Sequence, residues 1–139
     1  MAVGAEVMKL RIFGLGYVGC VSAACLSAVG HEVIGVDSNS LKVEGINSGR
    51  SPIIEPGVED LIANSVKEQK LKATTDVTSA IVESDLSLVC VGTPSNHNGS
   101  LDLRYIKRVC QEIGAAFEAK RGYHCLAIRS EERRVGKEC

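Results

Sequence analysis

The chain has 139 residues, a formal net charge of −1 and 45% hydrophobic residues, which suits one domain with a sizeable core. The balanced charge predicts no nucleic-acid partner, and no apolar run reaches membrane-spanning length, so we expect no membrane partner either. The six cysteines form no Cys-x-x-Cys pair and no metal-type cluster, so we expect no metal site and buried, reduced thiols in a cytoplasmic protein.

The first predicted element is an apolar strand at 9–13, which runs into a glycine-rich turn and a helix at 17–29. Three glycines in Gly-x-Gly-x-x-Gly spacing each have a separate expected role in binding a dinucleotide. Gly14 allows the tight turn, Gly16 lets a diphosphate approach the backbone, and Gly19 lets the helix pack against the strand. The amino end of the helix then faces the diphosphate.

A second short strand at 32–36 ends at Asp37, about 20 residues after Gly16, the spacing at which a carboxylate reaches the ribose hydroxyls. Ser38 and Asn39 bring no cation for a 2′-phosphate, so NAD is favoured over NADP. The alternative is an ordinary glycine turn of another α/β protein, in which Asp37 serves as a helix cap.

The remaining elements continue the alternation of strands and helices. Ser38 or Ser40 is expected to cap a helix through 47, with Leu41 among its apolar positions. The alternation predicts a single α/β domain of the Rossmann type, with a doubly wound parallel sheet and right-handed crossovers. The further expected elements are helices at 58–69, 76–83 and 102–120 and strands at 71–75, 86–91 and 124–128.

Two loop residues stand where a ligand binds in such a sheet. Thr93 follows the strand at 86–91, at the carboxyl edge of the sheet, and is either a cofactor contact or a turn hydroxyl. Glu55 is expected to organise the turn before Pro56 and not to take part in catalysis. None of the three histidines has a visible base partner, so no catalytic residue is assigned.

Four segments together resemble the amino-terminal, NAD-binding domain of the UDP-glucose/GDP-mannose dehydrogenase family over residues 8–130. The match looks closest to the GDP-mannose branch, with the UDP-glucose branch as the alternative. The resemblance implies NAD-dependent oxidation of the C6 alcohol of a nucleotide-sugar substrate to a carboxylate, in a protein that is homo-oligomeric when full length. It also implies cofactor contacts at Tyr17, Val18, Asp37, Lys42 and Thr93. The segments that carry the resemblance are 13–19, 35–37, 51–57 and 91–95.

The resemblance stops short of the family's catalytic residues. Its nucleophilic cysteine, lysine and asparagine lie beyond the first domain, and residues 131–139 depart from the family pattern. Residues 1–7 are expected to be an amino-terminal extension. We therefore expect a truncated fragment that is inactive alone. A stand-alone dinucleotide-binding module remains the alternative from a different class of protein.

Overall fold

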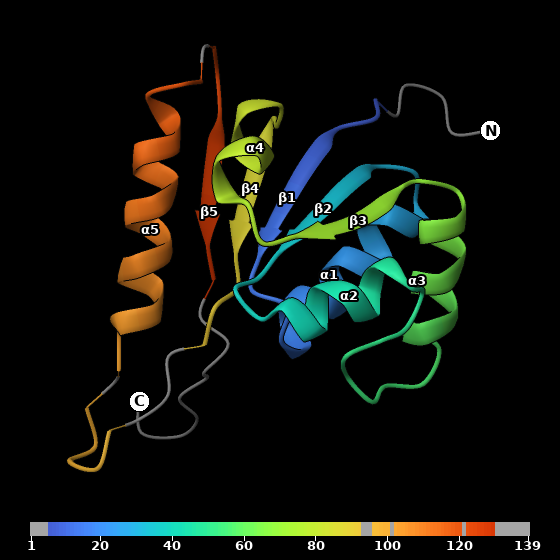
Figure 1. The fold of residues 1–139 in the computed structure, drawn as a ribbon, viewed down its shortest axis with the longest axis horizontal. Helices are drawn as coiled ribbons and strands as arrows, with labels where there is room; N and C mark the ends of the chain where they lie inside the picture. The colour runs from blue at the N-terminus through green and yellow to red at the C-terminus, as the bar shows by residue number, and fades with distance from the viewer. Residues whose placement is uncertain (1–5, 93–95, 101, 121, 130–139) are drawn as a thin grey trace, which may run out of the picture.

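The computed structural model describes residues 6–92, 96–100, 102–120 and 122–129 (Figure 1). Its centre is a parallel five-stranded sheet in the order β3-β2-β1-β4-β5, which confirms the predicted Rossmann-type fold. The strands are β1 (Lys9–Phe13), β2 (Glu32–Val36), β3 (Leu71–Thr74), β4 (Leu86–Val89) and β5 (Cys125–Ile128).

The helices form a layer on each side of the sheet. One apolar cluster joins the sheet to the first three helices, and a second joins it to the last two, which lie side by side in Figure 1. Two covered faces are what a doubly wound sheet requires. The helices are α1 (Tyr17–Ala28), α2 (Ser40–Asn47), α3 (Val58–Lys67), α4 (Val77–Val82) and α5 (Arg104–Phe117).

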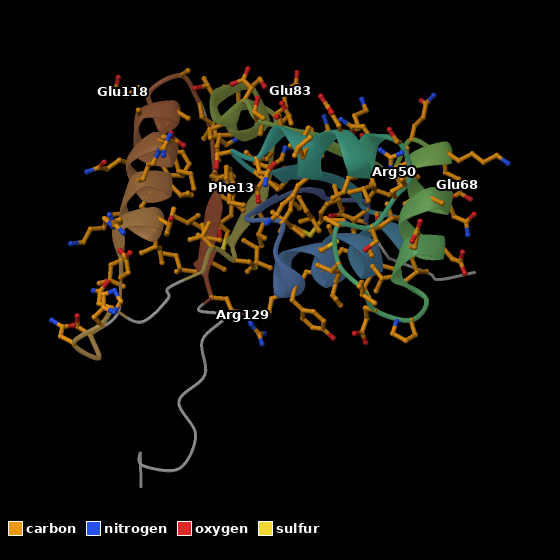
Figure 2. The ribbon with its side chains drawn as sticks, turned by 60° about the horizontal axis from the view of Figure 1, so that its bottom comes forward. Phe13, Arg50, Glu68, Glu83, Glu118 and Arg129 are labelled. Atoms are coloured by element: carbon orange, nitrogen blue, oxygen red, sulfur yellow. The ribbon has the colours of Figure 1, made fainter. Side chains whose placement is uncertain are left out.

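Strand β1 is buried on both faces because it lies in the middle of the sheet. Leu10 and Ile12 belong to the cluster under α1–α3, whereas Phe13 belongs to the cluster under α4 and α5. Figure 2 shows Phe13 in the interior, with Glu68 and Glu118 at the periphery. The alternation along β1 therefore anchors both helical layers to one strand.

Arg11 is a charged residue inside this apolar strand, with only 3% of its surface exposed. Its Nε donates to the Ala80 carbonyl at 2.6 Å, and its terminal nitrogens donate to the carbonyls of Leu10 at 3.0 Å and Glu83 at 3.4 Å. Burial lowers the pKa of Arg11, and the nearby carboxylates, Glu83 foremost, oppose that shift. The guanidinium thus ties β1 to the carboxyl end of α4, where backbone carbonyls favour a cation.

The start of α2 differs from the expectation. The cap is Asn39, whose side-chain oxygen accepts from the Leu41 amide at 3.0 Å, and not Ser38 or Ser40. Leu41 is 76% exposed, so its predicted place among the apolar positions is wrong. The buried residue of this helix is Ile46, and the five-residue separation puts Leu41 about 140° away around the helix.

The cysteines are only partly as expected. Cys20 and Cys90 are buried, but Cys25 is exposed, because it lies on the outer side of α1. Within the described ranges, no cluster of three potential metal ligands is present. No helix in the part of the chain that the structure describes is long and apolar enough to span a bilayer.

At the amino edge of the sheet, His124 is held between β4 and α5. Its Nε2 lies 2.9 Å from the Ser87 hydroxyl and its Nδ1 lies 3.2 Å from the Ser84 carbonyl. The imidazole ring also packs on the Phe117 ring, with centroids 5.2 Å apart. These contacts suit a neutral ring in which Nδ1 donates and Nε2 accepts. Burial is the main reason why the pKa of His124 is lowered from its ordinary value of 6.5.

This environment makes stability depend on pH. Below the ordinary value of 6.5, the unfolded chain takes up a proton at His124 that the folded chain resists, so stability should fall as pH falls. We expect His124→Gln to reduce the loss of unfolding free energy between about pH 7.5 and 5.5, measured by urea unfolding. His97→Gln, in an exposed loop, is the control and should leave the loss unchanged. Equal pH dependence in both variants would contradict the assignment.

Helix α3 ends in a left-handed residue that is not glycine. Gln69 has a φ of 61°, its amide donates to the Val66 carbonyl at 3.0 Å, and the Lys70 amide donates to the Ser65 carbonyl at 2.8 Å. Glycine adopts this conformation without the steric penalty of a Cβ atom. We expect Gln69→Gly to stabilise the fold by about 1 kcal/mol, measured as a higher urea midpoint. Gln69→Ala should gain nothing, and a lower midpoint for the glycine variant would refute the argument.

Candidate functional site

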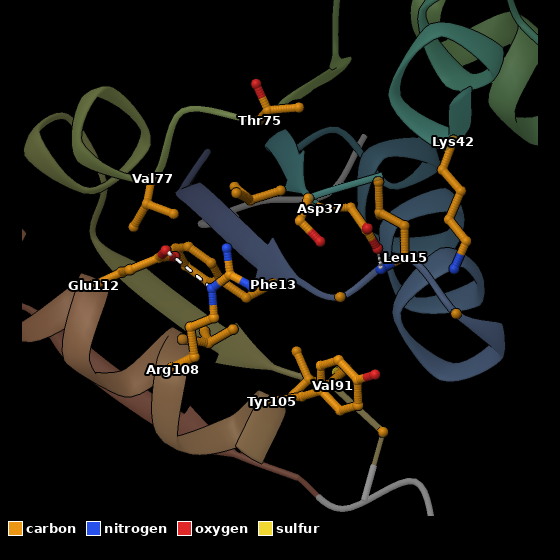
Figure 3. Close-up of a pocket in the computed structure, with 17 residues that line it drawn as sticks. Phe13, Leu15, Asp37, Lys42, Thr75, Val77, Val91, Tyr105, Arg108 and Glu112 are labelled. Carbon is orange, nitrogen blue, oxygen red and sulfur yellow. Dashed lines mark hydrogen bonds and ion pairs between the residues drawn. The ribbon is translucent and has the colours of Figure 1, made fainter. Parts of the chain in front are cut away.

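A cavity of 540 Å³ opens at the carboxyl edge of the sheet (Figure 3). The turn between β1 and α1 and the end of β2 form one wall, while α5 forms the opposite wall. The carboxyl edge of a parallel sheet is the place where α/β proteins bind their ligands. The lining residues include Gly14, Gly16, Asp37, Ser38, Lys42, Thr75, Val77, Val91, Gly92, Tyr105, Arg108, Val109 and Glu112.

The glycine turn of this wall admits no side chain at two of its positions. Gly14 has a φ of 99°, and a Cβ there would come within 2.8 Å of the Cys90 carbonyl oxygen. A Cβ on Gly19 would overlap the carbonyl oxygen of Gly14 itself. Gly19 therefore lets α1 pack closely against the turn at Gly14. The sequence had suggested packing against the strand, which is a more distant neighbour. Gly16 precedes α1 in an extended conformation, with a φ of −81° and a ψ of −155°.

The carboxylate of Asp37 is oriented by two backbone amides. Its Oδ2 accepts from the Leu15 amide at 2.8 Å, and its Oδ1 accepts from the Asn39 amide at 2.8 Å. Each carboxylate oxygen has a second lone pair, so both keep the capacity to accept from a ligand hydroxyl. The alternative interpretation made Asp37 the cap of the following helix. Asn39 caps α2 instead, so that part of the alternative is wrong.

The other residues named from the resemblance lie in different surroundings. Lys42 lines the cavity, and its ammonium points toward the first wall in Figure 3. Tyr17 is 53% exposed, and the nearby Glu55 carboxylate raises the pKa of Tyr17. Val18 packs against the core in the first turn of α1. Thr93 lies outside the described residues.

Glu55 lies in the loop before α3, close enough to the first turn of α1 for its carboxylate to affect Tyr17. The expectation that Glu55 organises the turn before Pro56 stays a prediction.

Several cavity residues were not found by the sequence analysis. Thr75 and Val77 follow β3, and Tyr105, Arg108 and Glu112 lie on one face of α5. The first pair was within reach of sequence reasoning, because β3 ends at the same edge as β2. The α5 residues could not be predicted, because polar residues along one side of a helix are usually its solvent-exposed face.

Comparisons with known proteins show which family the chain resembles. A model of the UDP-glucose/GDP-mannose dehydrogenase family, NAD binding domain, matches residues 8–130. A GDP-mannose 6-dehydrogenase from Pseudomonas aeruginosa is 54% identical over 123 residues, which are 88% of this chain and 28% of that protein. A UDP-glucose 6-dehydrogenase from Bacillus subtilis is 38% identical over 122 residues, 88% of this chain and 26% of that protein.

A solved structure shares the fold as well. The crystal structure of a ternary complex of GDP-mannose dehydrogenase from Pseudomonas aeruginosa matches with a TM-score of 0.87 and 54% identity. The match covers 90% of this chain and 29% of that one. The chain therefore spans less than a third of the length of the relatives that it matches.

The close contact at Gly19 gives a direct test of the turn. Gly19→Ala should lower the free energy of unfolding by about 3 kcal/mol or more, because the Cβ meets a backbone oxygen that has no room to rotate away. Gly45→Ala is the matched control in α2, where a Cβ meets nothing within 4 Å. That variant should gain up to about 1 kcal/mol. Urea unfolding measures both, and similar stability for the two variants would contradict the geometry.

Proposed function

Since the chain belongs to the UDP-glucose/GDP-mannose dehydrogenase family and corresponds to its NAD binding domain, we propose that it binds NAD in the cavity at the carboxyl edge. The diphosphate lies against Gly14 and Gly16 and the amino end of α1, where the amides of Tyr17 and Val18 belong to the first turn. Gly19 allows this helix to start so close to the turn. The amino terminus of a helix attracts anions.

The oriented carboxylate of Asp37 is the observation that carries this proposal. Its two oxygens are fixed by the Leu15 and Asn39 amides at the rim of the cavity, in position for the two hydroxyls of a ribose. Lys42 lines the same cavity and supplies a cation on the adenosine side of the site. Thr93, which lies outside the described residues, is proposed as a further cofactor contact. A carboxylate at this point repels a 2′-phosphate, so the site suits NAD better than NADP.

We further propose that the chain serves a GDP-mannose 6-dehydrogenase, with NAD accepting hydride from the C6 alcohol of the nucleotide sugar. The 54% identity to the Pseudomonas enzyme, against 38% to the Bacillus UDP-glucose enzyme, supports the GDP-mannose substrate. In this proposal the longer protein is a cytoplasmic homo-oligomer. UDP-glucose is the second candidate substrate, on the strength of the same family match.

The cofactor assignment is tested by comparing NADH with NADPH. The unmodified chain should bind NADH more tightly, and Asp37→Ala should weaken NADH about tenfold or more, since a charged hydrogen bond contributes roughly 1.5–3 kcal/mol. Because Asp37 also holds the Leu15 amide, damage to the turn would weaken both nucleotides equally. The ratio of the two affinities, measured by fluorescence titration, therefore isolates the carboxylate.

A second carboxylate provides the control for this experiment. Asp76 follows the neighbouring strand β3 and caps α4 by accepting from the Ser79 amide at 3.3 Å. Asp76→Ala should leave the ratio of NADH to NADPH affinity unchanged. Equal binding of the two nucleotides by the unmodified chain would refute the proposal.

A further inference from the structure

The second wall of the cavity is made of side chains that the glycine turn and Asp37 leave unexplained. Tyr105, Arg108 and Glu112 project from α5 toward the cavity, across from Asp37 (Figure 3). Their spacing of three and four residues places them on one face of the helix. The wall therefore presents one aromatic ring, one cation and one carboxylate to whatever occupies the cavity.

The proposed position of NAD determines which part of it meets this wall. With the adenosine ribose at Asp37 and the diphosphate at the glycine turn, the base has to leave the ribose on the side away from the turn. On that side of Asp37 lie Val77 at the start of α4 and Arg108 on α5. Val109, next to Arg108 in the chain, also lines the cavity. The adenine ring is thus directed into the space between α4 and α5.

Arg108 is the cation of α5 that lines the cavity among the described residues. Its Nε lies 3.7 Å from Oε1 of Glu112, one turn further along, and its side chain is 70% exposed. Such a pair contributes little to helix stability. The N–H donors of a guanidinium lie in its plane, so an ion pair made through Nε still leaves a flat face for a ligand. Arginine planes stack readily on nucleic-acid bases.

We propose that Arg108 is an adenine-binding residue whose guanidinium stacks on the face of the base, and that Glu112 is a positioning residue that fixes the plane of the guanidinium. Val77 and Val109 supply apolar contacts beside the ring. This inference rests on the proposed NAD site and deepens it, because it assigns the adenosine half of the cofactor to side chains that no glycine fingerprint contains.

The test compares Arg108→Met with Lys107→Met by titrating NADH and ADP-ribose into each full chain. Lys107 is the matched control, since it lies on the same helix, is exposed and is not among the described residues that line the cavity. Arg108→Met should weaken both ligands by the same factor, about threefold to tenfold, because both carry the adenosine half. Lys107→Met should weaken neither.

Titration at high salt distinguishes stacking on the base from long-range attraction between the Arg108 cation and the diphosphate. The loss of NADH and ADP-ribose affinity caused by Arg108→Met should persist in about 1 M sodium chloride, where the Debye length is roughly 3 Å. A factor that disappears in salt, or that Lys107→Met reproduces, would overturn the proposal, as would unchanged affinity. If the unmodified chain binds neither NADH nor ADP-ribose, the NAD site itself is wrong and this inference falls with it.

The role of Glu112 is tested by a double-mutant cycle. Glu112→Gln alone should weaken NADH, but in the Arg108→Met background it should have no further effect, since it acts through the guanidinium. A merely structural role in α5 would instead give additive losses in the two backgrounds. Additive losses would therefore remove Glu112 from the proposal while leaving the stacking result to decide on Arg108.

Discussion

The hydrogen bond between the Asp37 carboxylate and the Leu15 amide joins the two segments on which the cavity depends. It connects the end of β2 to the middle of the glycine turn, at 2.8 Å. Leu15 is fully buried, and a Cβ on Gly35 would come within 2.7 Å of its side chain. The turn, the buried leucine and the end of β2 therefore form one unit, in which the carboxylate is oriented by the backbone before any ligand arrives.

The two edges of the sheet have different physical roles. The carboxyl edge offers an open cavity, whereas the amino edge holds a set of buried polar groups that all find partners among the described residues. Arg11 fastens α4 there through backbone carbonyls, and His124 packs on Phe117 at the end of α5. Because residues of α4 and α5 line the cavity, these distant contacts position its second wall.

The sequence predicted the features that are set by local backbone geometry. The Gly-x-Gly-x-x-Gly spacing, the acid after the second strand and the alternation of strands and helices gave the fold and the first wall of the cavity. The errors came from tertiary context. Leu41 was expected among the apolar positions of its helix, yet α2 packs on the sheet through Ile46 and leaves Leu41 exposed. The burial of Arg11 by α4 was not predicted. Neither outcome follows from a residue's own neighbours in the chain.

The two walls of the cavity also differ in how a protein would alter them. At Gly14 and Gly19 the atoms in the way are backbone atoms, so substitution there changes the turn itself. On α5 the cavity is lined by long side chains, and Arg108 and Glu112 keep 70% and 45% of their side-chain surface exposed. Exposed helix positions accept substitution at little cost in stability. In the proposed NAD site, contacts with the adenosine half are therefore free to change without changing the fold, whereas contacts with the diphosphate are built into the fold.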